Sequence, residues 1–443
     1  MDSIIQYHEH PAILLQKLIQ YNTTNPPGNE AEIVAFIQRL LKDAGIPTQI
    51  LAKSPNRPNL IARLPGRGDA PPLLLQGHVD VVTTAGQTWT HPPFSGEIID
   101  GYVWGRGALD MKGGIAMMLA ALLRIKAHGI IPPGDVLLTI LSDEEAGSDM
   151  GAKFLVEEHP DIFRNVRYAI GEFGGFTLYA GGKTFYPIQV SEKQISWIRI
   201  TIHGEGGHGS MPVRGGAVAK LGKILVAIDK NRLPVHITPV VRDMLTTMSQ
   251  EIGGIRGILL KQLLTPRLTD FMLNIMGEQG AVFDSILHNT VSPTIIRGSD
   301  KINVIPSEVT VDLDGRLLPG QKPEDLIREV RSILGPLGKE VQIDVIRYDP
   351  GPDKVDMGWF DTLGGILKEL SPQAIPVPLL LSGVTDARFF SRLGIQTYGF
   401  LPMKLPPDFA FSKTIHAADE RVPVEAIKFG TEAIYRAIQR VRG

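Results

Sequence analysis

The segment LLLQGHVD, residues 73–80, joins a short apolar run to a histidine and an aspartate. Such a run is typical of a strand buried on both faces of a parallel sheet. Ligands bind such sheets at the carboxyl ends of the strands. Side chains two residues apart on an extended chain point the same way, so His78 and Asp80 share a face. A carboxylate beside a metal-binding imidazole orients it, although a solvated turn is the simpler interpretation of this segment alone.

Strands and helices alternate around this segment, which predicts an α/β domain with a mostly parallel sheet flanked by helices. The expected strands are Thr48–Ala52, Leu60–Leu64, Leu73–His78 and Val136–Leu141, and the expected helices are Ile33–Ala44, Gly113–His128, Gly151–Glu158, Trp359–Leu370 and Val424–Arg440. The pattern changes near residue 190, where Ile195–Ile202 alternates with period two like a half-exposed antiparallel strand. Helices at Ala217–Asp229 and Pro323–Leu334 and strands at Glu308–Leu313 and Val341–Tyr348 complete the second pattern.

We therefore predict a discontinuous catalytic domain over residues 1–189 and 350–443, with an inserted α+β lid or dimerisation domain over residues 190–349. Residues 235–290 within the insert are unusually rich in Met, Leu and Ile and are expected to form an extra apolar helical segment. In the simpler interpretation, this segment is a helical hairpin that packs against its own domain. The alternatives are a lid over an acyl-binding pocket and an oligomer contact, because methionine-rich surfaces adapt to varied ligands.

Four more segments place acids or a histidine at predicted strand or loop ends. The stretch GRGALDMKGG (105–114) runs into a helix with Asp110 just before it, where a carboxylate can serve merely as an N-cap. The motif SDEEAG (142–147) places Glu144 and Glu145 directly after a buried strand, although paired glutamates are usually surface charges. Glu172 follows another apolar run, and His416 lies shortly before the last helix.

Imidazole and carboxylate ligands suit zinc best, with cobalt or manganese as the alternatives. Two histidines, one aspartate and at least two glutamates exceed the needs of one tetrahedral ion that keeps an open position. They suffice for two ions that share a carboxylate. The chain has no cysteine, so thiolate sites, disulfides and cysteine nucleophiles are excluded.

The overall composition limits which binding partners and which cellular locations are expected. The 443 residues carry a formal net charge of −2, and no basic run predicts a nucleic-acid or anionic membrane partner. The sequence contains no stretch of about 18 uncharged apolar residues, so no transmembrane helix is expected. The N-terminus lacks the features of a secretory signal. A cytoplasmic location is the expectation from this sequence.

Taken together, GHVDVV (77–82), GRGALDMKGG, SDEEAG, the pair Gly171-Glu172 and IHAADERV (415–422) resemble, in order, the M20 family of metallopeptidases. That family includes carboxypeptidases, aminoacylases, dipeptidases and succinyl-diaminopimelate desuccinylase. The resemblance implies that one metal is held by His78, Asp110 and Glu172 and the other by Asp110, Glu145 and His416. It also implies that Asp80 orients His78 and that Glu144 is the general base that takes a proton from the attacking water.

The resemblance extends to the inserted domain. GGHGSMP (206–212) is similar to the family segment whose histidine, here His208, stabilises the oxyanion, often across a dimer interface, although many members have Ala at the position of Gly207. A loop histidine with a structural role is the alternative for His208. Arg316 resembles the residue that clamps a substrate carboxylate, while Asn303, Asn289 and Gly383 are further candidates for substrate binding.

These observations predict a di-metal hydrolase that cleaves an amide bond in an N-acyl amino acid, a dipeptide or a C-terminal peptide bearing a free carboxylate. The long segment at 235–290 resembles the larger carboxypeptidase-S-like and N-acyl amino acid hydrolase branch, which suggests a hydrophobic acyl or side-chain group. A carbamoyl amidase on the same scaffold and a non-catalytic binding homologue are the alternatives. A serine hydrolase has little support because the Gly-x-Ser-x-Gly elbow is missing from the sequence.

Overall fold

The computed structural model describes residues 4–352 and 354–442. They divide into two compact units, described here one at a time. Of the described residues, the first unit comprises 4–190, 355–379 and 385–442, and the second comprises 191–352, 354 and 380–384. Among the described residues, no helix combines the length and apolar character that crossing a bilayer requires.

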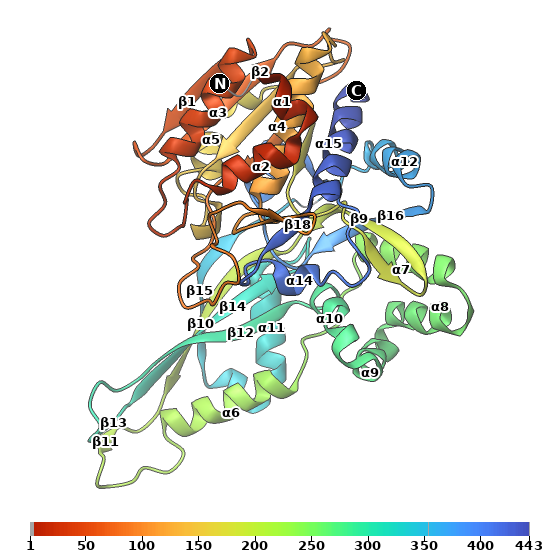
Figure 1. Cartoon of the computed structure of the whole chain (residues 1–443). Helices are drawn as coiled ribbons and strands as arrows, with labels where there is room; N and C mark the ends of the chain where they lie inside the picture. The colour runs from red at the N-terminus through yellow and green to blue at the C-terminus, as the bar shows by residue number, and fades with distance from the viewer. Residues whose placement is uncertain (1–3, 353, 443) are drawn as a thin grey trace. The chain divides into compact units, whose positions relative to one another are not determined.

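The first unit is built on one large sheet with strand order β1-β2-β6-β3-β7-β17-β9-β16, in which β8 pairs with β9 (Figure 1). The central strands β6 (Val136–Leu141), β3 (Leu73–His78), β7 (Tyr168–Gly171) and β17 (Gln396–Gly399) are parallel. On one side β1 (Thr48–Ala52) and β2 (Pro58–Leu64) continue the sheet antiparallel. The predicted α/β class with a mainly parallel sheet is thus confirmed. Sequence reasoning missed β17, β9 (Lys183–Glu192) and β16 (Ala374–Leu381).

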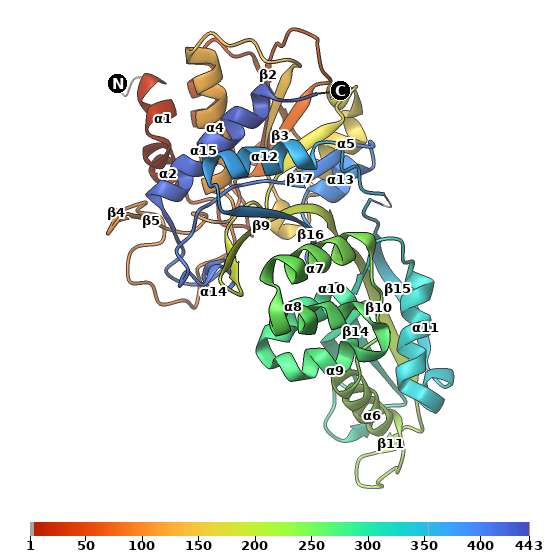
Figure 2. The same ribbon diagram turned by 90° about the vertical axis from the view of Figure 1, so that its right-hand side faces the viewer.

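Helices cover both faces of this sheet. Helix α4 (Lys112–Ala127) is almost wholly buried because it packs against β3, α2 (Pro11–Ile19) and α15 (Val424–Gln439), while α12 (Phe360–Leu370) packs against α15 (Figure 2). Gly77 of β3 lies close to α4, since an added Cβ there would be 2.9 Å from Cδ1 of Ile115. On the other face, Leu74 packs with Phe154 of α5 (Ala152–Glu158) and Phe389 of α13 (Ala387–Ser391). The remaining helices of this unit are α1 (Ile4–Glu9), α3 (Ala31–Asp43) and α14 (Phe411–Thr414).

The second unit has an antiparallel sheet of order β12-β14-β10-β15. Its strands are β12 (Thr290–Arg297), β14 (Glu308–Leu317), β10 (Gln194–His203) and β15 (Gln342–Asp349). The period-two pattern of β10 buries Ile198, Ile200 and Ile202 against helices α6 (Ala217–Lys230) and α11 (Pro323–Leu334). A short ribbon of β11 (Gly207–His208) and β13 (Val304–Ile305) extends from this unit (Figure 1).

The Met- and Leu-rich segment folds into α7 (Pro239–Ile252), α8 (Gly254–Lys261), α9 (Pro266–Met276) and α10 (Ala281–Leu287) (Figure 2). Part of its apolar content is internal, since Met244, Met248 and Met272 are buried. The rest is exposed, including Ile258 at 62% and Phe271 at 61%. Internal packing therefore explains only part of the apolar composition of this segment.

Candidate metal centre

Three neighbouring parallel strands place polar side chains at one edge of the large sheet. Strand β3 ends at His78, β7 ends one residue before Glu172, and β6 leads through two residues into a short 3₁₀ turn that begins at Glu144. Because β6, β3 and β7 run in the same direction, their carboxyl ends lie together. This is the position at which open α/β sheets bind ligands.

The structure forms two groups of metal-ligand type at this edge. His78, Asp110 and Glu172 form one group, Asp110, Glu145 and His416 form the other, and the donor atoms within each group lie within 4.8 Å of one another. Asp110 belongs to both groups. Its Oδ1 lies 3.1 Å from Nε2 of His78, and its Oδ2 lies 2.9 Å from Nε2 of His416. The carboxylate thus presents one oxygen to each group, as a bridging ligand does.

These residues fit a pair of divalent cations. Two imidazoles with three carboxylates form a donor set that zinc, cobalt and manganese accept. Oε1 of Glu145 is buried and makes no hydrogen bond, although it lies 3.4 Å from Nε2 of His416. A buried carboxylate oxygen left in this state costs free energy, and a cation would satisfy it.

The same side chains that would hold the cations also bind protons tightly. The hydrogen bond to Asp110 and the nearby carboxylate of Glu145 raise the pKa of His416 to about 10. Burial alone would lower the pKa of His78, but the charge of Glu172 and the hydrogen bond to Asp110 outweigh it and raise the pKa. Burial raises the pKa of Glu172 to about 7. Because a cation must displace these protons, its binding becomes stronger as pH rises.

The sequence of this chain identifies its family. Residues 74–440 match the sequence profile of peptidase family M20/M25/M40. The chain belongs to this family. It is therefore an M20-type metallopeptidase, and M20 peptidases act on peptide or amino acid substrates.

Among curated proteins, the M20 chain is 28% identical over 384 residues to the human "N-fatty-acyl-amino acid synthase/hydrolase PM20D1", covering 83% of this chain and 74% of that one. It is 26% identical over 425 residues to "Aminoacylase-1" of Sus scrofa, covering 94% and 91%. Among solved structures, it is similar in fold to human carnosine dipeptidase 1, with a TM-score of 0.66, 15% identity and coverage of 98% and 96%. A metallo-carboxypeptidase from Sulfolobus solfataricus gives a TM-score of 0.66 at 14% identity, with 99% of each chain covered.

Asp80 makes further contacts in this M20 site besides those to His78. Nδ1 of His78 lies 2.9 Å from the backbone carbonyl oxygen of Asp80 and 3.5 Å from its carboxylate. The carboxylate accepts hydrogen bonds from the backbone N–H groups of Glu144 and Glu145 and from the side chain of Asn25. Asp80 therefore connects the first histidine to the loop that carries both glutamates, which the sequence does not reveal.

Glu144 lies beside the two ligand groups and belongs to neither. Its side chain is 12% exposed, and Oε1 lies 3.9 Å from Nη1 of the buried Arg388. Burial and the charge of Glu172 raise the pKa of Glu144 well above its ordinary value. A carboxyl group with a raised pKa can both accept and return a proton.

Sequence reasoning missed a buried polar network behind this loop. Arg57 pairs with Glu30 at 2.7 Å and with Asp143 at 2.9 Å, and the side chain of Asn25 donates to both Asp143 and Asp80. Asp143 is part of the quoted SDEEAG motif, but its distant partners carry no recognisable local pattern. Their roles follow only from the contacts.

The other predicted residues lie in the second unit. His208 is exposed on β11 with Nδ1 2.8 Å from Oγ of Ser210, and the backbone oxygen of Asn303 accepts a hydrogen bond from Gly209. Nε and Nη2 of Arg316 donate to the carboxylate of Asp314.

Asn289 and Gly383 gain no positive support as substrate-binding residues. The side chain of Asn289 is buried, donates to Glu329 and accepts from the backbone N–H of Leu318. An added Cβ at Gly383 would have Leu381 at 3.9 Å as its nearest neighbour, so the position does not demand glycine for space. The roles of both residues stay predictions.

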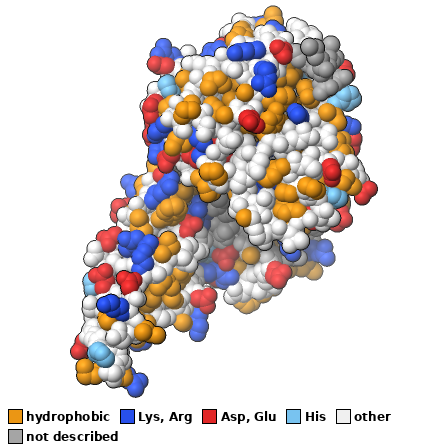
Figure 3. Space-filling model, turned by 60° about the vertical axis from the view of Figure 1, so that its left-hand side comes forward, with side chains coloured by type: hydrophobic (Ala, Val, Ile, Leu, Met, Phe, Trp, Pro, Cys, Tyr) orange, Lys and Arg blue, Asp and Glu red, His pale blue; other side chains and the backbone are white. Residues whose placement is uncertain are grey.

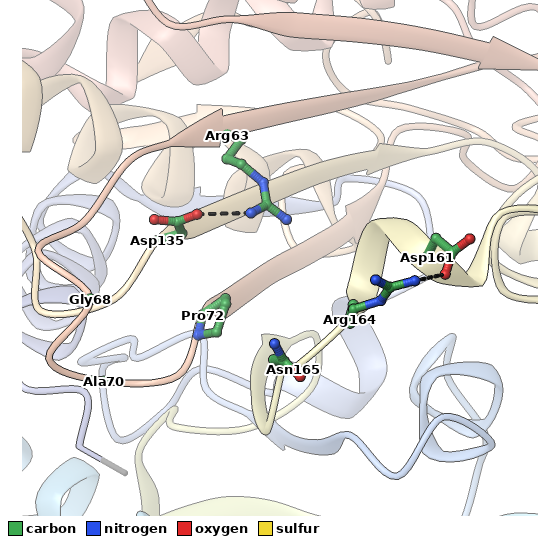
Figure 4. A pocket seen from close by; sticks show the side chains of 8 residues that line it. All are labelled: Arg63, Gly68, Ala70, Pro72, Asp135, Asp161, Arg164 and Asn165. Carbon is green, nitrogen blue, oxygen red and sulfur yellow. Dashed lines mark hydrogen bonds and ion pairs between the residues drawn. The ribbon is translucent and has the colours of Figure 1, made fainter.

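A pocket of about 570 Å³ on the first unit lies at the wrong end of the strands for this chemistry (Figure 4). Pro72 and Asp135, which line it, immediately precede β3 and β6, whereas the ligands follow the carboxyl ends of those strands. Its arginines, Arg63 and Arg164, are each paired with an aspartate (Figure 4). On the molecular face that Figure 3 shows, basic and acidic side chains are interspersed, as the small net charge suggests.

Proposed function

We propose that this chain is a di-metal amidohydrolase that cleaves N-acyl amino acids, with dipeptides and C-terminal peptide bonds as related substrates. The observation that carries the proposal is Asp110, whose two oxygens face the two ligand groups. His78 and Glu172 would complete one metal site, and Glu145 and His416 the other. Zinc is the proposed ion, because its borderline character suits imidazole with carboxylate.

When bound, the two cations would lower the pKa of water toward neutrality and polarise the scissile carbonyl. Glu144 would take the proton from the attacking water and deliver it to the leaving nitrogen. His208 would donate a hydrogen bond to the oxyanion, an interaction worth about 3 kcal/mol in comparable sites. Arg316 would bind the substrate carboxylate through its guanidinium, and Asn303 is proposed to contact the substrate as well.

We propose an apolar acyl group on the substrate for two reasons. The similar human protein is named as an N-fatty-acyl-amino acid synthase/hydrolase. The segment at 235–290 also exposes large apolar side chains, Ile255, Ile258, Leu259, Phe271 and Ile275 among them. Hydrophobic binding strengthens by about 0.8 kcal/mol for each buried CH₂ group, so kcat/KM should rise as the acyl chain lengthens.

The test uses protein stripped of metal by a chelator and reloaded with Zn²⁺, Co²⁺ or Mn²⁺. Hydrolysis of N-acyl amino acids with chains from acetyl upward is then compared with hydrolysis of dipeptides and of an N-carbamoyl amino acid. We expect two ions per chain, loss of activity on chelation and a preference for longer acyl chains. Full activity after exhaustive chelation refutes the di-metal mechanism. A flat response to chain length refutes the apolar acyl group, and preferred hydrolysis of the carbamoyl substrate favours the carbamoyl amidase instead.

We also propose a homodimer in which the partner chain can supply His208. Support comes from the resemblance of residues 206–212 to the family segment that acts across an interface. Mixing separately inactive His208 and Glu144 variants tests this proposal, because shared sites restore part of the activity. Lack of rescue favours a site completed within one chain.

A further inference from the structure

A buried carboxylate lies beneath the loop that carries Asp110. Glu420 is fully buried, and its Oε1 accepts backbone hydrogen bonds from Gly107 at 3.1 Å, Leu109 at 2.8 Å and Asp110 at 3.2 Å. The backbone oxygen of Glu420 also accepts a hydrogen bond from Gly105. The loop before α4 therefore wraps around one side chain supplied from the far end of the chain, four residues beyond His416.

Arg106, in the same loop, extends this connection to the backbone of His416. Its Nη1 lies 2.5 Å from Oε2 of Glu420 and donates to the carbonyl oxygen of Ala417. Its Nη2 donates to the carbonyl oxygen of His416 and to Oε1 of Gln87. Nε2 of Gln87 donates to that same carbonyl oxygen of His416, at 2.9 Å. One guanidinium thus joins the two loops that supply a metal-ligand group.

The loop of His416 needs such support. The side chain of His416 is 48% exposed, so packing alone does not hold the imidazole in place. Its backbone has φ 60, in the left-handed region that side chains other than glycine rarely adopt. Hydrogen bonds from Arg106 and Gln87 to its carbonyl fix this conformation, and the ring then reaches Asp110.

Stability alone is a poor explanation for this buried pair. Burying two charges costs several kcal/mol of desolvation per ion, and apolar replacements of such pairs are often neutral or stabilising. Arg106 also buries its Nε without a hydrogen-bond partner. What the pair achieves is geometric: it holds Asp110 and His416, 306 residues apart in sequence, at 2.9 Å.

We propose that Arg106 and Glu420 are positioning residues that set the geometry of the ligand group formed by Asp110, Glu145 and His416. Glu420 orients the Asp110 loop and Arg106 orients the His416 loop. The inference rests on the proposed function, in which these side chains hold two cations. Partners behind metal ligands typically contribute 10- to 100-fold in metal affinity.

Titration of metal-free protein with Zn²⁺ against a chromogenic chelator tests the two roles separately. In Arg106→Lys, the three N–H donors of the ammonium cannot replace the four hydrogen bonds that the guanidinium makes to Glu420, Gln87 and the carbonyl oxygens of His416 and Ala417. We expect one of the two zinc ions to bind at least tenfold more weakly and the other as in the wild type. In Glu420→Gln, we expect both ions to weaken because Asp110 serves both groups. Co²⁺-loaded protein should show a changed absorption spectrum in each variant.

Arg124→Lys is the matched control. Arg124 also joins a carboxylate to a backbone carbonyl, with Nη1 2.8 Å from Glu432 and Nη2 3.2 Å from the oxygen of His8. It lies near the carboxyl end of α4, and its variant should bind both ions normally. A wild-type chain that fails to bind two ions refutes the proposed function itself.

If a folded Arg106→Lys protein binds both zinc ions with wild-type affinity, the positioning role of Arg106 is wrong, while the proposed function is unaffected. Should that variant fail to fold, Gln87→Ala decides, because it removes one donor to His416 without leaving a buried charge unpaired. We expect it to weaken one zinc ion several-fold, and unchanged binding overturns the inference.

Discussion

Replacing Asp80 by asparagine should destabilise the metal-free protein although the two side chains have the same shape. Oδ1 of Asp80 accepts from the backbone N–H of Glu144, and Oδ2 accepts from that of Glu145 and from Asn25. An asparagine has one oxygen, so its NH₂ group must face at least one of these donors in either orientation. Because the side chain of Asp80 is fully buried, at least one of its donors then loses its acceptor.

The number of lost hydrogen bonds sets the expected loss of stability. A hydrogen bond to a charged acceptor contributes about 1.5–3 kcal/mol, and leaving a buried donor unpaired costs a similar amount. We therefore expect Asp80→Asn to lower the free energy of unfolding by about 3 kcal/mol. The same change frees the loop of the two glutamates and removes the carboxylate near His78, so zinc affinity should fall by about 10- to 100-fold.

Urea unfolding of the metal-free wild type and variant measures the first effect, and competition with a chelator measures the second. Asp69→Asn is the control: its partner Arg67 is 52% exposed and Asp69 itself 62% exposed, so less than about 1 kcal/mol is expected. If Asp80→Asn costs no more than Asp69→Asn and binds zinc like the wild type, the reasoning from the hydrogen bonds of Asp80 is wrong.

Three further predictions concern Glu144, His208 and His288. Glu144→Gln should keep both metal ions but lower kcat by about 10²–10⁴-fold through loss of the proton acceptor, measured by metal analysis and steady-state kinetics. His208→Ala should lower kcat more than it raises KM, because an oxyanion donor acts in the transition state. Burial alone would lower the pKa of His288, but its hydrogen bonds to Asp284 outweigh burial and raise it. The protonated His288 therefore contributes stability that is present below about pH 6.5 and lost as pH rises through the higher folded-state value. The destabilisation caused by His288→Asn should accordingly shrink between pH 6 and pH 9 in urea unfolding.

Each of these three predictions has a contrary outcome. Near-normal turnover of Glu144→Gln contradicts its role as base, and a pure KM effect in His208→Ala means that the histidine only positions substrate. The control for His288 is the substitution His128→Gln, because His128 is exposed and makes a hydrogen bond with Tyr435. If the destabilisation by His288→Asn grows with pH, the sign assigned to its titration is wrong.

Local patterns in the sequence were sufficient to predict the strands that carry the candidate metal ligands. The apolar run before His78 and the one before Glu144 indicated buried strands, and both strands form with the expected ends at Leu73–His78 and Val136–Leu141. Because adjacent parallel strands end together, these local patterns sufficed to bring histidine and acid to one sheet edge. The strands β9, β16 and β17 escaped notice, because burial there depends on distant neighbours rather than on a clean period. The helices α1 and α2 were also missed, although α2 buries Leu14, Leu15 and Leu18 at helical spacing.

The sequence by itself determined the chemistry: a chain without cysteine, with imidazoles and carboxylates at strand ends, in the order of the M20 family. Only the tertiary structure decided how Asp110 turns one oxygen to each histidine, and that Arg106, Glu420 and Asn25 hold the surrounding loops. The physical reason is range. Strand and helix patterns reflect neighbours a few residues away, whereas the hydrogen bond between Asp110 and His416 joins residues that only folding brings together.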